Sequence, residues 1–218
     1  MKTRTMLAGR AGAALIALSL APAEALAHHA MDGKLPVTAL QGFITGLAHP
    51  VVGLDHLAFV VAVGLAAALL GRLVALPLAF VGGTLAGCVV HLASVTLPAT
   101  EIVIAATVVA MGLLVATGRT LPPAVLLAFT AAAGLFHGWA YGEGIFGAEQ
   151  SPLGAYLAGF TLIQAAIAVG TALAARTLLA SPAADRSFVR IAGAVVLGIG
   201  IAMLVGHVEA IAFPGLAK

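Results

Sequence analysis

Long apolar stretches recur along the chain and are separated by short breaks that hold most of its charged residues. Beyond residue 27 there are six such stretches, at about 37–70, 73–95, 102–116, 123–139, 153–179 and 188–213. Most are long enough to cross a hydrocarbon layer of about 30 Å as a helix. The runs are continuous, without the polar–apolar alternation of a membrane β-barrel. We therefore predict an all-α, polytopic membrane helix bundle with six transmembrane helices.

The composition supports this fold class. Hydrophobic residues make up 62% of the chain and charged residues 8%, whereas about a quarter of the residues in an ordinary soluble domain are charged. The mean hydropathy is +1.15. This excludes a protein with a fully water-facing surface. No linker or change of composition divides residues 28–218, so we expect a single membrane domain there.

The first 27 residues have the three-part pattern of a secretory signal peptide. Lys2, Arg4 and Arg10 precede the apolar run 11–21, and Ala25-Leu26-Ala27 matches an A-x-A cleavage site. We predict a cleavable signal peptide over residues 1–27; a retained first span is the alternative. The remaining chain carries seven basic and seven acidic residues, and this neutral balance gives no reason to expect a nucleic-acid partner.

The breaks between the apolar stretches alternate in charge. Basic residues occupy the breaks after the first, third and fifth stretches, at Arg72, Arg119, Arg176, Arg186 and Arg190. The breaks after the second and fourth carry acidic residues instead, at Glu101, Glu143 and Glu149. By the positive-inside rule the basic breaks are cytoplasmic. We therefore expect a bacterial inner-membrane protein whose mature N- and C-termini are periplasmic.

A dense group of ionisable residues interrupts the first apolar stretch. His49, Asp55 and His56 lie within eight residues, and on a continuous helix the two histidines would share a face. Pro50 and Gly53 between them favour a break, which transporters use to build ion sites. Imidazole suits Ni, Co, Cu and Zn ions, and a carboxylate adds compensating charge. The group is either a transition-metal site or an Asp–His pair that braces a kink.

A second group lies at the outward end of the fourth stretch, over residues 136–143. His137 and Tyr141 are four residues apart and would share a helical face. We expect His137 to belong to the metal site, and Glu143 to attract cations at the mouth of a pathway. Trp139 and Tyr141 are equally well explained as interfacial aromatic residues.

Further candidate ligands lie elsewhere in the chain. His91 is in the second stretch, with Ser94 expected on the same helical face. After signal-peptide removal, His28 and His29 would place two imidazoles beside a free amine, which is either a periplasmic capture site or a cleavage boundary without a further role. Cys88 is the only cysteine, which excludes an internal disulfide and a multi-cysteine metal site.

Glycines are abundant, and two stretches contain clusters of them. The whole chain has 26 glycines, and small residues allow membrane helices to approach closely. We expect a packing role for the clustered glycines, which are Gly82, Gly83, Gly87, Gly193, Gly198 and Gly200.

The two polar groups together resemble the signatures of the HupE/UreJ family of nickel and cobalt permeases. The first signature is similar to the run His49-Pro50-x-x-Gly53-x-Asp55-His56, and the second to Phe136-His137-Gly138-x-Ala140-x-Gly142. The resemblance covers essentially the whole mature chain. It implies uptake of Ni²⁺ or Co²⁺ by secondary transport, with His49, Asp55, His56 and His137 as functional residues.

The second signature departs from the family's usual form at two positions. That form has another histidine where this chain has Tyr141, and a glutamate where it has Gly144. One imidazole is therefore absent, which leaves the identity of the metal open. Glu143 could replace the glutamate only if the segment is no longer regular helix, because one residue is about 100° of rotation.

We expect transport of Ni²⁺ or Co²⁺ from periplasm to cytoplasm, with no enzymatic activity and no permanently bound cofactor. The chain has no G-x-x-x-x-G-K-[ST] nucleotide-binding motif. The alternatives are a membrane-embedded zinc-dependent hydrolase and a metal-binding sensor or assembly protein without flux. The residues that could supply the hydrolase site are His56, His91, His137, Asp55 and Ser94. The sequence leaves energy coupling and oligomeric state open.

Overall fold

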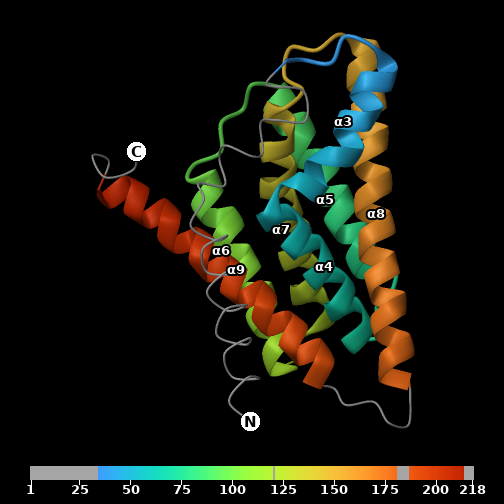
Figure 1. Cartoon of the computed structure of the whole chain (residues 1–218), viewed down its shortest axis with the longest axis vertical. Helices are drawn as coiled ribbons and strands as arrows, with labels where there is room; N and C mark the ends of the chain where they lie inside the picture. The colour runs from blue at the N-terminus through green and yellow to red at the C-terminus, as the bar shows by residue number, and fades with distance from the viewer. Residues whose placement is uncertain (1–33, 120, 181–186, 214–218) are drawn as a thin grey trace, which may run out of the picture.

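The computed structural model describes residues 34–119, 121–180 and 187–213. Within these ranges the chain is all-helical, which confirms the predicted fold class; the proposed signal peptide, His28 and His29 lie outside them. The helices, drawn as coiled ribbons in Figure 1, are α3 (Ala39–Val52), α4 (Leu54–Leu69), α5 (Ala75–Leu92), α6 (Thr100–Thr117), α7 (Pro123–Glu143), α8 (Gln150–Ala180) and α9 (Ser187–Ala212).

The first predicted span is broken, as its sequence indicated. Helices α3 and α4 meet at Gly53 with a bend of 79°, and the extended conformation of Gly53 (φ −71°, ψ 108°) ends one helix and begins the next. Pro50 lies inside α3 and does not end it. In the described residues the other five helices are each long and apolar enough to span a membrane, and the bent pair makes up to a sixth span.

Helix α4 lies at the centre of the bundle. It packs against α8, α6, α9 and α5, and Figure 1 shows it inside the bundle beside the long helix α8. The main hydrophobic core contains most of α4, including Phe59 and Val63, which are fully buried. The large apolar side chains of α8 and α9 that remain exposed, such as Leu162 and Ile201, provide a surface suited to lipid. The polar residues at the start of α4 are therefore surrounded by other helices and not by lipid.

Most of the clustered glycines lie where two helices touch. A Cβ atom at Gly83 or Gly87 of α5 would collide with the backbone of α7, and one at Gly193 or Gly200 of α9 would collide with the backbone of α6. The predicted packing role is confirmed for these four. It is wrong for Gly82 and Gly198, because residues 34–119, 121–180 and 187–213 place no neighbouring atom within 4 Å of such a Cβ.

The glycines of α5 provide a matched pair of variants. In Gly87→Ala the new methyl would meet the carbonyl oxygen of Leu135 and lie 2.8 Å from the backbone nitrogen of Trp139. We expect a loss of stability of about 1–3 kcal/mol, typical of overpacking. Gly82→Ala should be neutral or stabilising, because alanine has the higher helix propensity. Thermal unfolding in detergent measures both, and equal effects would contradict glycine-mediated packing of α5 on α7.

Candidate metal-binding site

The first and second polar groups of the sequence meet at a pair of buried histidines. His56 lies in the first turn of α4 and His137 in the second half of α7. Their Nδ1 atoms are 2.8 Å apart, and their side chains are 6% and 0% exposed. The break at Gly53 and the packing of α4 between its neighbours thus bring together two imidazoles that are 81 residues apart in sequence.

His49 adjoins this pair from the other side of the break. Its ring centroid is 6.3 Å from that of His56 and 5.2 Å from that of Tyr141. Its Nδ1 is 2.7 Å from the hydroxyl of Tyr156, which donates to the carbonyl of Tyr141 at 2.8 Å. On a continuous helix the two residues would share a face, and the predicted break changes how they meet. The helix turns at Gly53, so the two residues do not share one helical face.

Asp55 adds a negative charge to the cluster. Its Oδ1 accepts the backbone N–H of His56 at 2.7 Å, one of the amide groups that a helix N-terminus leaves without an intrahelical partner. The carboxylate is buried and interacts electrostatically with the imidazoles of His56 and His137 and with the hydroxyl of Tyr141. Asp55 therefore holds the start of α4 and places its charge where a cation would be balanced.

Two hydroxyl groups at the site were missed by the sequence analysis. Thr107 of α6 has its Oγ1 3.1 Å from His137 Nε2 and donates to the carbonyl of Ile104 at 2.7 Å. Tyr156 of α8 makes the contact with His49 described above. The available signal was that Thr107 is the one polar residue in the apolar stretch 102–116.

His91 lies apart from the histidine pair. Its ring contacts are with Trp139, at a centroid distance of 4.4 Å, and with Phe146, at 5.5 Å. Helix α5 ends at Leu92, and Ser94 has a positive φ of 60°. The prediction that His91 and Ser94 share a helical face was therefore wrong, because the backbone has already turned at Ser94.

Glu143 lies at the rim of the cluster. It is the last residue of α7, it is exposed, and it interacts electrostatically with His56. The following residue, Gly144, is closer to the cluster: a Cβ there would lie 2.8 Å from Cε1 of His49. Because α7 stays helical through Glu143, this carboxylate does not take the place that a side chain at position 144 would occupy.

Two possible metal-binding atoms already lie close together in the structure, Nδ1 of His56 and Nδ1 of His137. Among the described residues, no three His, Cys, Asp or Glu side chains are arranged to hold a metal ion together. Tyr141, however, offers a further polar atom: it is 0% exposed, and its ring centroid is 4.4 Å from that of His56. Its hydroxyl has no hydrogen-bond partner in the part of the chain that the structure describes. A buried unpaired hydroxyl is unfavourable, so this one suits a ligand or a bound water.

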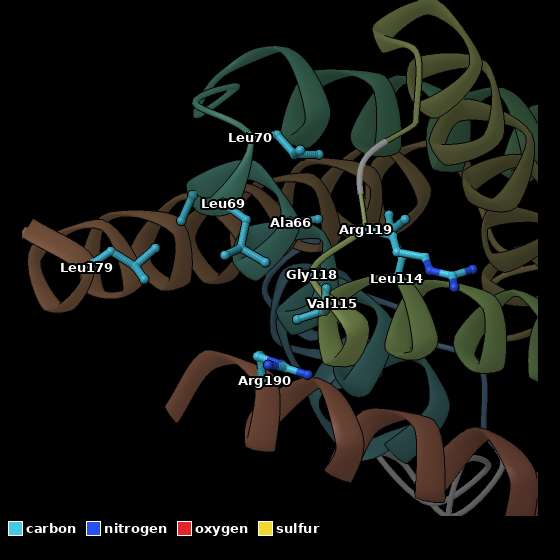
Figure 2. Close-up of a pocket in the computed structure, with 10 residues that line it drawn as sticks. Ala66, Leu69, Leu70, Leu114, Val115, Gly118, Arg119, Leu179 and Arg190 are labelled. Carbon is cyan, nitrogen blue, oxygen red and sulfur yellow. The ribbon is translucent and has the colours of Figure 1, made fainter. Parts of the chain in front are cut away.

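A cavity of about 300 Å³ at the other end of α4 has a different character (Figure 2). Its walls are mostly apolar side chains of α4, α6 and α8, and Arg119 and Arg190 also line it. Ala66, on its wall, is ten residues along α4 from His56, or roughly 15 Å of helix. Two guanidinium groups oppose a cation, so we do not assign this cavity to a metal.

The fold and this site define a polytopic membrane helix bundle with a buried imidazole pair at a broken helix. The family model described as HupE / UreJ protein matches residues 16–203. The Protein HupE of Rhizobium leguminosarum bv. viciae is 36% identical over 170 residues, which cover 76% of this chain and 85% of that protein. The chain therefore belongs to the HupE/UreJ family. No solved structure matches it significantly.

The two tyrosines of the site should differ in their effect on stability in the absence of metal. Tyr141→Phe removes a hydroxyl without a hydrogen-bond partner and should leave the melting temperature unchanged or higher. Tyr156→Phe removes a hydroxyl that bonds to two groups, and should cost about 1–3 kcal/mol because buried partners lose their bonds. Thermal unfolding of the metal-free variants tests this, and an equal loss in both would contradict the different roles of the hydroxyls.

Proposed function

We propose that this protein transports a divalent transition metal ion, Ni²⁺ or Co²⁺, from periplasm to cytoplasm through the histidine cluster. The observation that carries the proposal is the His56–His137 pair, whose Nδ1 atoms lie 2.8 Å apart at a break in a membrane-embedded helix. Ionisable groups inside a membrane bundle are costly and usually mark an ion pathway.

The separation of the two nitrogens suits a shared metal ion. A transition metal binds imidazole nitrogen at roughly 2.1 Å, so two such ligands at a right angle are about 3.0 Å apart. The observed 2.8 Å is close to this value. An ion could therefore replace the proton between the rings with little movement of either helix.

The groups around the pair provide charge and additional donors. Asp55 contributes a buried carboxylate, and Tyr141 a hydroxyl without a hydrogen-bond partner. Imidazole with oxygen donors suits borderline ions such as nickel and cobalt. Glu143, exposed at the end of α7, would raise the local concentration of cations at the outer mouth.

The charge distribution and the membrane potential together support inward transport. The basic breaks assign Arg72 and Arg119 to the cytoplasm, so the Glu143 end of α7 is periplasmic. Two positive charges moving inward gain about 4.6 kcal/mol per 100 mV of negative-inside potential, at about 2.3 per charge. The membrane potential is therefore sufficient for uptake without nucleotide hydrolysis.

A zinc-dependent hydrolase is less well supported by the arrangement of the ligands. A catalytic zinc site usually holds its ion with three protein ligands and one water. Among the described residues, no three His, Cys, Asp or Glu side chains are arranged to hold a metal ion, and His91, one of the residues considered for that hydrolase site, packs on Trp139 and Phe146. A nitrogen pair with weaker oxygen donors holds an ion loosely enough to release it, as transport requires.

Metal uptake into proteoliposomes tests the proposal. Purified protein should accumulate Ni²⁺ or Co²⁺ when a negative-inside potential is applied, and Zn²⁺ and Cu²⁺ in competition should rank its selectivity. We expect His56→Ala to lower uptake at least tenfold, because the loss of a group that only orients a metal ligand already costs about 10–100-fold, and this change removes a ligand itself.

His207→Ala is the matched control. His207 lies on α9, where its Nε2 is 3.8 Å from a carboxylate oxygen of Glu101, and it makes no ring contact with the His56–His137 pair. Uptake by this variant should match the wild type. Unchanged uptake in His56→Ala would remove the pair from the pathway. Tight zinc binding with lipid cleavage and no flux would support the hydrolase instead, and binding without flux would support a sensor.

A further inference from the structure

We propose that Thr107 of α6 is a positioning residue that fixes His137 in the tautomer with its proton on Nε2 and its Nδ1 lone pair toward the metal ion. The inference rests on the proposed function, since it assigns how the histidine pair is prepared for its ion. It depends on which group donates in each of three consecutive hydrogen bonds.

The first bond determines the direction of the others. The Thr107 hydroxyl has one proton, and at 2.7 Å it faces the carbonyl oxygen of Ile104, which can only accept. The same Oγ1 is 3.1 Å from His137 Nε2. With its proton already donated, Thr107 accepts from the ring, so Nε2 of His137 carries a hydrogen.

The assignment of the Nε2 proton determines the roles of the next two nitrogens, Nδ1 of His137 and Nδ1 of His56. A neutral imidazole has a hydrogen on one nitrogen only, so Nδ1 of His137 has a lone pair. Nδ1 of His56 is 2.8 Å away, and it must be the donor. Each group in this series of hydrogen bonds therefore donates to the next: His56 donates to His137, His137 to Thr107, and Thr107 to the carbonyl of Ile104.

The surroundings of His137 are largely apolar. The ring is fully buried and packs on Phe59 and Phe80, at centroid distances of 4.6 and 5.9 Å. Both neighbours are apolar, and the hydrogen bonds recorded for the ring are those with Thr107 and His56. Among the described residues, Thr107 is the hydrogen-bond partner found for Nε2, so loss of its hydroxyl removes the acceptor of the Nε2 proton.

The consequence for metal binding is direct. An ion binds a lone pair, and His137 offers one at Nδ1 only while its proton stays on Nε2. A histidine free to move that proton to Nδ1 would spend part of its time with the metal-facing nitrogen blocked. Groups that orient a ligating histidine in this way typically change metal affinity by about 10–100-fold when removed.

The same arrangement occurs at His49. The hydroxyl of Tyr156 donates to the Tyr141 carbonyl at 2.8 Å, so it accepts from His49 Nδ1 at 2.7 Å. The lone pair of His49 is then on Nε2. Two histidines of the cluster, on different helices, are thus each held by a hydroxyl whose own proton is given to a backbone carbonyl.

Three threonine variants separate positioning from packing. Thr107→Val keeps the shape and removes the hydroxyl, whereas Thr107→Ser keeps the hydroxyl. Thr130→Val is the matched control, because Thr130 is fully buried and donates to the carbonyl of Leu126 at 2.8 Å. No hydrogen bond joins it to a histidine among the described residues. Each is measured as full-length protein in detergent.

The first measurement is the ¹⁵N spectrum of metal-free protein labelled at histidine, with His137 assigned by its absence in His137→Gln. We expect an Nε2–H tautomer in the wild type, in Thr107→Ser and in Thr130→Val, and a mixture of tautomers in Thr107→Val. A wild-type proton on Nδ1 of His137 would overturn the inference. This test does not depend on metal transport.

The second measurement is Co²⁺ binding followed by its visible absorption. Thr107→Val should bind about 10–100-fold more weakly with a changed spectrum, while Thr107→Ser and Thr130→Val should resemble the wild type. Equal binding by Thr107→Val and Thr130→Val would reduce Thr107 to a packing residue. If the wild type itself bound no Co²⁺, the proposed function would fail, and the tautomer measurement would still decide the assignment of the proton.

Discussion

The break at Gly53 is the constraint on which the rest of the site depends. It turns the chain by 79° and starts α4 inside the bundle. A side chain at this position would meet Cδ2 of His56 at 2.7 Å and Oδ1 of Asp55 at 3.2 Å, so glycine leaves the space that those two residues use. Non-helical backbone at membrane depth is tolerated only where protein or water surrounds it. The helices packed around α4 meet this condition, and Asp55 binds one of the amide groups at its start.

The second requirement is that polar groups in an apolar interior have partners. The imidazole nitrogens that face hydroxyls do so in a defined direction, with Thr107 and Tyr156 as acceptors. These bonds offset much of the cost of burying the rings. The Tyr141 hydroxyl is the exception, since it is buried beside His56 with no partner. The histidines of the cluster are thus hydrogen-bonded, while the Tyr141 oxygen is left without a partner among the described residues. This combination suits a ligand that binds and is released.

The sequence predicts the helices well because long apolar runs have few alternatives in a membrane, and it predicts the break because Pro50 and Gly53 interrupt such a run. It also identifies His56 and His137, since each is an ionisable residue in an apolar segment. It does not identify Thr107, because a threonine in a membrane helix usually bonds to its own backbone, and only the packing of α6 on α4 and α7 brings it to His137. Periodicity failed for His49 with His56 and for His91 with Ser94, because in both cases the backbone leaves the helix between or just after the two residues.

The two departures from the family's second signature are neighbours in space. Tyr141 packs its ring against His49 at 5.2 Å, and a Cβ at Gly144 would lie 2.8 Å from the same imidazole. Tyr141 also packs against His56, at a centroid distance of 4.4 Å, so this residue borders both histidines of the first signature. The hydrogen bonds of His56, His137 and Thr107 involve neither Tyr141 nor Gly144. Relative to a signature with histidine and glutamate at these two positions, a difference in metal preference should accordingly arise where Tyr141 and Gly144 border His49 and His56.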